Sequence, residues 1–258
     1  MDGLIYGACA LVTAISAAIR LHYTRKRRQQ TAYPVARRAR TLAFAACFIG
    51  SLLAIPTVAE AIDRLTTLNE VSTLASDLAA LLFWTSLQVM VADWRHIGTH
   101  HLGIAVRIIA VSCIALLLVW QYHLADTTRM ELSTAYARND DVAVYLLAYL
   151  SYSAVAALEI GAFSTSMAFV TWRDHPAASI GLSIAAVGGI CGLAYACSRG
   201  GYLIAYRTGH AWPLAVENTI SPAFAGLSII CVATGLAMAT ICYNLPLRNP
   251  HPGAGSRV

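Results

Sequence analysis

Residues Ser179 to Tyr206 read SIGLSIAAVGGICGLAYACSRGGYLIAY, and this stretch decides the fold class. It is long and apolar enough to cross a bilayer, since about 20 such residues span the hydrocarbon core. One permanent cation, Arg199, lies within it. A charged side chain at membrane depth is costly and usually faces a partner or water inside a helix bundle. The stretch therefore predicts a membrane-spanning helix in a bundle that has a polar interior.

The composition of the whole chain agrees with this interpretation. Of its 258 residues, 58% are hydrophobic and 12% are charged, whereas a soluble domain has about 25% charged residues. We therefore expect an all-α, polytopic membrane helix bundle in the plasma membrane. Seven transmembrane helices are predicted, over residues 4–22, 41–62, 71–92, 104–124, 142–172, 178–206 and 217–243. The Pro/Gly-rich residues 244–258 are expected to form a disordered cytoplasmic tail.

The distribution of basic residues predicts the orientation. One loop, from Arg25 to Arg40, holds seven of the eighteen basic residues, and seven crossings place thirteen of the eighteen on the same side as this loop. Cytoplasmic loops are enriched in Lys and Arg, so we expect the N-terminus outside and the C-terminus inside. Anionic lipid is the expected partner of the loop, and nucleic acid is not.

Helix geometry brings Arg199 and Asp77 into one layer. At about 1.5 Å per residue, Arg199 lies roughly 10 Å and Asp77 roughly 9 Å below the outer boundary, with Glu60 and Glu217 slightly above them. One hypothesis is that these four residues line a water-accessible pocket for a small polar solute. The alternative is structural: a direct Arg199–Asp77 pair joins two helices, and Glu60 and Glu217 are solvated among the lipid headgroups.

Glu159 is expected near the membrane midplane. Tyr145, Tyr149 and Tyr152 share its helix face by their spacing. Glu159 is therefore a candidate for a proton-titratable gate, and a purely structural role is the alternative.

Glycines precede and follow Arg199 in the same predicted helix, at Gly188, Gly189, Gly192, Gly200 and Gly201. Glycine permits a helix to unwind at a binding site. It is also common at ordinary contacts between membrane helices. The sequence leaves both interpretations open.

The sequence offers little support for catalysis, a cofactor or a metal site. No two of the seven cysteines have Cys-x-x-Cys spacing, and no Gly-rich phosphate loop or His-Glu-x-x-His motif is present. His96 and His100 have metal-ligand spacing, but only Asp93 is placed to complete such a set. We therefore expect no metal, no cofactor and no enzymatic activity.

Residues 55–95 combine Pro56, an Ala-Ile-Asp helix end, a short Asn-containing loop and an apolar third helix with one polar residue in its first turns. This pattern resembles a family of actinobacterial multi-helix integral membrane proteins labelled provisionally as transporters. Members typically carry a cytoplasmic C-terminal domain, whereas about fifteen residues follow Tyr243 here. The resemblance implies a small-solute transporter without that domain. A non-transporting membrane sensor or a partner-binding subunit is the alternative.

Overall fold

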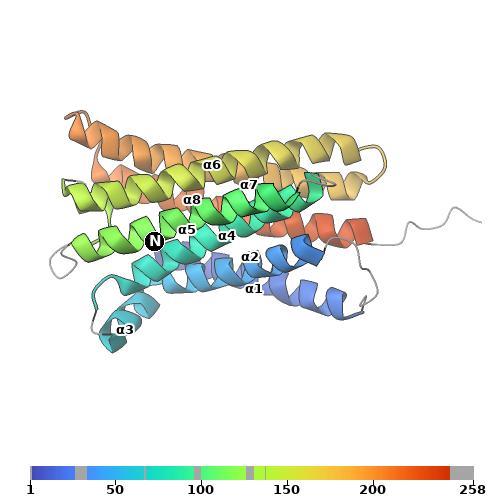
Figure 1. Ribbon diagram of the computed structural model, residues 1–258, viewed down its shortest axis with the longest axis horizontal. Coiled ribbons are helices and arrows are strands. Elements are labelled where there is room, and N and C mark those ends of the chain that lie inside the picture. The colour runs from blue at the N-terminus through green and yellow to red at the C-terminus, as the bar shows by residue number, and fades with distance from the viewer. Residues whose placement is uncertain are drawn as a thin grey trace, which may run out of the picture.

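The computed structural model describes residues 2–26, 34–66, 68–95, 100–125, 131–136 and 138–244, and over these ranges the chain is an all-α bundle (Figure 1). Its eight α-helices are α1 (Asp2–Lys26), α2 (Pro34–Leu53), α3 (Pro56–Thr66), α4 (Val71–Arg95), α5 (His100–Leu124), α6 (Asp140–Thr171), α7 (Pro176–Arg207) and α8 (Leu214–Asn244), with a 3-10 turn, η1 (Thr134–Tyr136), before α6. The predicted all-α class is confirmed. Residues 27–33 of the basic loop and residues 245–258 of the predicted tail lie outside the described ranges.

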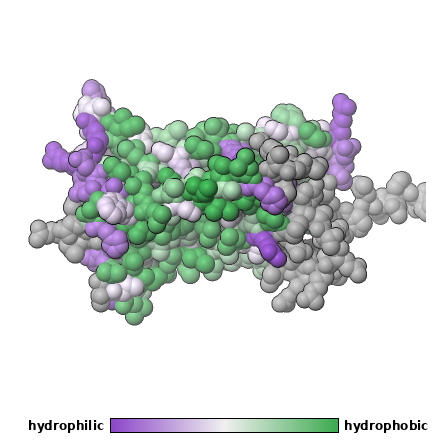
Figure 2. Space-filling view, viewed as in Figure 1, coloured by the Kyte–Doolittle hydropathy of each residue, from purple (hydrophilic) through white to green (hydrophobic). Residues whose placement is uncertain are grey.

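Five of these helices, α4 to α8, are long and apolar enough to cross a membrane, and the α2–α3 pair adds a sixth if the pair counts as one bent span. The apolar part of α1, Gly3–Ala18, is shorter. On the face seen in Figure 2, apolar side chains cover the middle of the bundle and hydrophilic side chains gather toward its ends. Helix length and composition thus indicate a multi-pass membrane protein.

The segment predicted as one helix over residues 41–62, in which Pro56 favours a kink or marks the last turns, forms two helices, α2 and α3. The chain bends by 84° between α2 and α3, because Pro56 lacks the N–H that would continue the helix and its ring crowds the preceding turn. In α3 no residue is buried. The carboxylate of Asp63 accepts hydrogen bonds from Ser72 N at 3.0 Å and Ser72 Oγ at 3.1 Å, which tie α3 to the start of α4.

Helix α7 packs closely between α6 and α8, and its glycines are the reason. A Cβ atom on Gly189 would lie 2.7 Å from Gly161 Cα of α6, and one on Gly181 would lie 2.7 Å from Ala239 N of α8. The helix runs without interruption from Pro176 to Arg207. These glycines therefore serve helix contacts, as small residues commonly do in membranes, and the alternative of an unwound segment is not observed.

Hydrogen bonds between neighbouring helices define the two ends of the bundle. At the end that carries α3, Arg207 of α7 pairs with Asp140 of α6 at 2.6 Å. At the other end, which holds the α6–α7 turn, Asp93 of α4 accepts from Ala36 N of α2 at 2.9 Å. We call these the α3 end and the α6–α7 end; both are visible in Figure 1.

Candidate functional site

A cavity of about 270 Å³ lies among α1, α2, α3, α4, α6, α7 and α8, in the half of the bundle nearer the α3 end. Its wall is largely apolar. The polar side chains that line it include those of Tyr6, Ser51, Asp77, Tyr149, Tyr195 and Arg199. Among the described residues that line it, Asp77 and Arg199 are the only charged ones. The two residues that helix rise placed in one layer thus contribute to the wall of one cavity.

Asp77 enters the cavity from the first turns of α4. Its Oδ2 atom accepts a hydrogen bond from the Tyr145 hydroxyl of α6 at 2.8 Å. Among the described residues, no donor is recorded for the second carboxylate oxygen, Oδ1. Asp77 therefore keeps one acceptor for another group in the cavity.

Arg199 lies across the cavity on α7, within electrostatic range of Asp77, Tyr6, Tyr149 and Tyr195. The Nε atom of Arg199 is buried and has no protein acceptor. Both charged residues are described, and no ion pair within 4.0 Å joins them. Arg199 and Asp77 therefore do not form the predicted direct pair.

The cavity wall also contains a hydroxyl without a hydrogen-bond partner, and three helices close its inner part. Ser51 of α2 is 4% exposed, and its hydroxyl has no hydrogen-bond partner in the protein. Trp84, Gly192 and Ser228 line the inner part of the cavity. A Cβ atom on Gly192 would lie 2.9 Å from Ser228 Oγ and 3.1 Å from Trp84 Cη2, so α4, α7 and α8 meet tightly there.

The rim of the cavity lies beside the α4 N-terminus. Leu132, just before η1, and Thr73 of α4 line the cavity. Glu70 precedes α4 in a left-handed conformation, with a φ of 61°. Burial raises the pKa of Glu70 above its ordinary value; a hydrogen bond with Thr73 acts in the opposite direction. A carboxyl whose charge is disfavoured by the folded structure thus lies next to the rim, through its contact with Thr73.

Glu60 lies outside this cavity. It is exposed on α3 and pairs with Arg64 one turn later at 3.2 Å. With Asp63, Arg64 and Asn69 it lines a separate, open depression at the α3 end. Glu60 is thus at the surface, as the structural alternative for this residue expected, and does not join Asp77 and Arg199.

Glu217 is also absent from the cavity lining, but it is not solvated. It is 1% exposed at the start of α8. Its carboxylate accepts hydrogen bonds from Ser198 of α7 at 3.1 Å, from Trp212 Nε1 at 3.2 Å and from Ser221. Neither interpretation from the sequence foresaw this arrangement, which joins α7 to α8.

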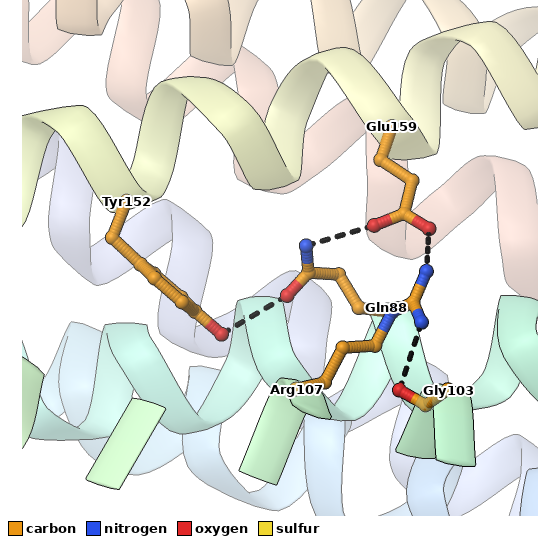
Figure 3. Close-up of polar contacts among 5 residues, drawn as sticks. All are labelled: Gln88, Gly103, Arg107, Tyr152 and Glu159. Carbon is orange, nitrogen blue, oxygen red and sulfur yellow. Dashed lines mark hydrogen bonds and ion pairs between the residues drawn. The ribbon is translucent and has the colours of Figure 1, made fainter. Parts of the chain in front are cut away.

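Glu159 belongs to a second polar group nearer the α6–α7 end (Figure 3). Its carboxylate forms an ion pair with Arg107 of α5 and accepts from Gln88 Nε2 of α4 at 2.9 Å. The Tyr152 hydroxyl donates to Gln88 Oε1 at 3.0 Å and shares a 2.6 Å hydrogen bond with Thr85. We call Thr85, Gln88, Arg107, Tyr152 and Glu159 the Glu159 network.

The sequence interpretation missed the role of Arg107. It counted Arg107 among the positive charges of the inner side, although Arg107 lies within the predicted helix 104–124. In the structure it reaches Glu159 and also donates from Nη1 to Gly103 O at 2.9 Å. Its position inside an apolar segment, like that of Arg199, was the signal that could have identified it.

No described residues form a metal site. Among them, no group of three or more His, Cys, Asp or Glu side chains is placed to hold a metal ion. The predicted pair of His96 and His100 falls outside the part of the chain whose side chains are described.

Comparisons with protein-family models, curated proteins and solved structures found no match to this chain. The resemblance to the actinobacterial family therefore stays a prediction. The function is therefore inferred from the geometry of the cavity and of the Glu159 network.

Proposed function

We propose that the protein crosses the plasma membrane seven times, with its N-terminus outside and its C-terminus inside. Seven crossings result when α1 and the bent α2–α3 pair each count as one span beside the five long helices. The basic residues from Arg25 to Arg40 support this orientation, because positive loops are retained in the cytoplasm, where they also attract anionic lipid. On this assignment the α3 end, and the cavity near it, face the outside.

The cavity then serves to bind a small polar solute, and the chain is a transporter of that solute. The observation that carries this proposal is the separation of Asp77 and Arg199 across one cavity. Two opposite charges inside a membrane protein normally offset their desolvation by direct pairing. Here they face a space large enough for a small molecule, so a bound solute can supply the missing contacts.

A non-transporting sensor is the second candidate, and the closed inner part of the cavity favours it. Trp84, Gly192 and Ser228 meet there, and the Glu159 network occupies the bundle beyond. Transport requires this region to open toward the α6–α7 end. Sensing requires access from the α3 end alone.

Cysteine reactivity distinguishes these cases. Cys47 lines the cavity, whereas Cys9 is 0% exposed and contacts Gly226 O. We suggest two variants in which either Cys47 or Cys9 is the sole cysteine, treated with charged, membrane-impermeant thiosulfonates in right-side-out and inside-out vesicles. Labelling of Cys47 but not Cys9 supports the binding cavity. Labelling from both sides favours transport, and labelling from the outside alone favours sensing. Equal protection of Cys47 and Cys9 rejects the proposed function.

A further inference from the structure

The charges of the cavity restrict the ligand, if the proposed solute-binding function holds. One cation and one anion, Arg199 and Asp77, line the cavity, so the lining carries no net formal charge. A ligand with a single charge would neutralise one of these residues and leave the other without a counter-ion. An uncompensated buried charge is strongly unfavourable. The site is balanced by a ligand that carries both signs.

Arg199 and Asp77 each have hydrogen-bonding atoms that such a ligand can pair with. Arg199 has a planar guanidinium that suits the two oxygens of a carboxylate, and its buried Nε has no acceptor in the protein. Asp77 accepts from Tyr145 through Oδ2 alone. An ammonium group, which has three donors, can bind the other oxygen.

The volume of the cavity and its apolar wall suit a small ligand. Its volume of about 270 Å³ lies just below the roughly 300–1,000 Å³ of pockets that hold drug-sized ligands. Phe83, Leu146 and Ile229 give it apolar surface. Ser51 adds a buried hydroxyl that lacks a partner. The space suits a short carbon chain with a charged group at each end.

We infer that the cavity binds a small zwitterion, with its carboxylate on Arg199 and its ammonium on Asp77. The two protein charges do not touch, so the ligand bridges them. A neutral polyol could use the tyrosines and Ser51, but it would supply a counter-ion to neither charge.

The test is a matched set of probes on the purified full chain in nanodiscs. Glycine, β-alanine and 4-aminobutyrate vary the separation between carboxylate and ammonium. Propionate lacks the ammonium of β-alanine, ethylamine lacks its carboxylate, and glycerol carries no charge. Binding is read from the shift in thermal unfolding and from protection of Cys47 against a thiosulfonate. We expect at least one zwitterion to bind at least tenfold more tightly than propionate, ethylamine or glycerol.

Two variants assign the ends of the ligand. Asp77→Asn should weaken the best zwitterion at least tenfold and strengthen propionate, whereas Arg199→Gln should weaken the zwitterion and strengthen ethylamine, because each variant removes the charge that the singly charged probe leaves uncompensated. Glu60→Gln, in the exposed depression on α3, is the matched control and should change neither. Because the comparison of probes on the wild-type chain is decisive by itself, a variant that fails to fold does not prevent the test.

Several results would overturn the inference. The first is that propionate, ethylamine or glycerol binds as tightly as every zwitterion. The second is that no zwitterion changes either thermal unfolding or the labelling of Cys47. If Cys47 reacts with the thiosulfonate but no zwitterion protects it, the ligand class is wrong and the cavity remains. If Cys47 does not react, the proposed function fails as well.

Discussion

The cavity and the Glu159 network each contain an arginine and a carboxylate within the apolar bundle, yet they use them differently. In the network, Arg107 donates from both terminal nitrogens, to Glu159 and to Gly103 O. In the cavity, Arg199 and Asp77 lie apart without an ion pair. The Nε atom is buried without a partner in both arginines, so the difference lies in the carboxylate contact. A closed pair holds helices together, and an open pair leaves room for a ligand.

The Arg107–Glu159 ion pair also attaches α5 to the rest of the bundle. Helix α5 lies at the edge of the bundle, with large exposed side chains such as Ile109, Leu116 and Trp120. Near one end of α5, Arg107 holds it to Glu159 of α6; near the other end, the Tyr122 hydroxyl donates to Asn69 O at 2.9 Å. This arrangement favours the structural interpretation of Glu159 over a proton-titratable gate.

The largest expected effect comes from breaking the closed pair. Removing one partner of a buried ion pair costs about 3–5 kcal/mol, and because the Arg107 and Glu159 side chains are 25% and 19% exposed, Arg107→Gln should lie at the lower end of this range. Arg199→Gln should cost less, since no ion pair is lost. Unfolding free energies in mixed micelles measure both. A loss for Arg199→Gln as large as that for Arg107→Gln would contradict the distinction between the two regions.

A second comparison follows α7 from its tightly packed part to the α3 end. Gly189→Ala places a Cβ 2.7 Å from the Gly161 backbone, whereas on Gly201 the nearest atom, Trp212 Cη2, is 3.6 Å away. Overpacking costs about 1–3 kcal/mol, so Gly189→Ala should destabilise the fold by this amount. Gly201→Ala should be neutral or slightly stabilising, because alanine favours helix. The same unfolding assay applies, and equal effects at both positions would show that α7 packs no more loosely at this end.

Matched removal of one hydroxyl from each region gives a smaller effect. Tyr152→Phe removes the partner of both Gln88 and Thr85, and an unsatisfied buried polar group costs about 1–3 kcal/mol. Tyr145→Phe removes one donor from Asp77, whose carboxylate faces the cavity and can bind water instead. We therefore expect a greater loss of stability for Tyr152→Phe. The opposite order would mean that Asp77 depends on Tyr145 more than the network depends on Tyr152.

The smallest effect is the pH dependence at the rim of the cavity. Burial raises the pKa of Glu70 above its ordinary value of 4.5, so the folded protein holds this proton more tightly than the unfolded chain. The contribution to stability is fully present below pH 4.5 and is lost as the pH rises through the folded pKa. Glu70→Gln should remove this decline from the profile of unfolding free energy against pH. An unchanged profile would show that Glu70 does not cause it.

The sequence predicted the helices better than the contacts between them. Apolar length alone located the long helices α4 to α8, which are the five candidate membrane spans. Helix rise placed Asp77 and Arg199 in one layer, and both line one cavity in the structure. The depth of a residue along a helix does not specify which way its side chain points around the helix axis. Depth alone therefore could not show that Glu60 lies at the surface or that Glu217 is buried and hydrogen-bonded. Pro56 indicated a kink but not the 84° bend, nor the hydrogen bonds from Ser72 to Asp63 that join α3 to α4.

The most direct test of the central claim compares one thiol in each region. Cys47 and Thr85 are both 5% exposed, but Cys47 lines the cavity whereas Thr85 belongs to the Glu159 network. Each is made the sole cysteine, as native Cys47 or as Thr85→Cys, and its rate of reaction with a charged thiosulfonate is measured in membrane vesicles. We expect labelling to be faster at Cys47, which lines the cavity, than at position 85. Equal rates at the two positions would contradict the division into an open site and a closed network.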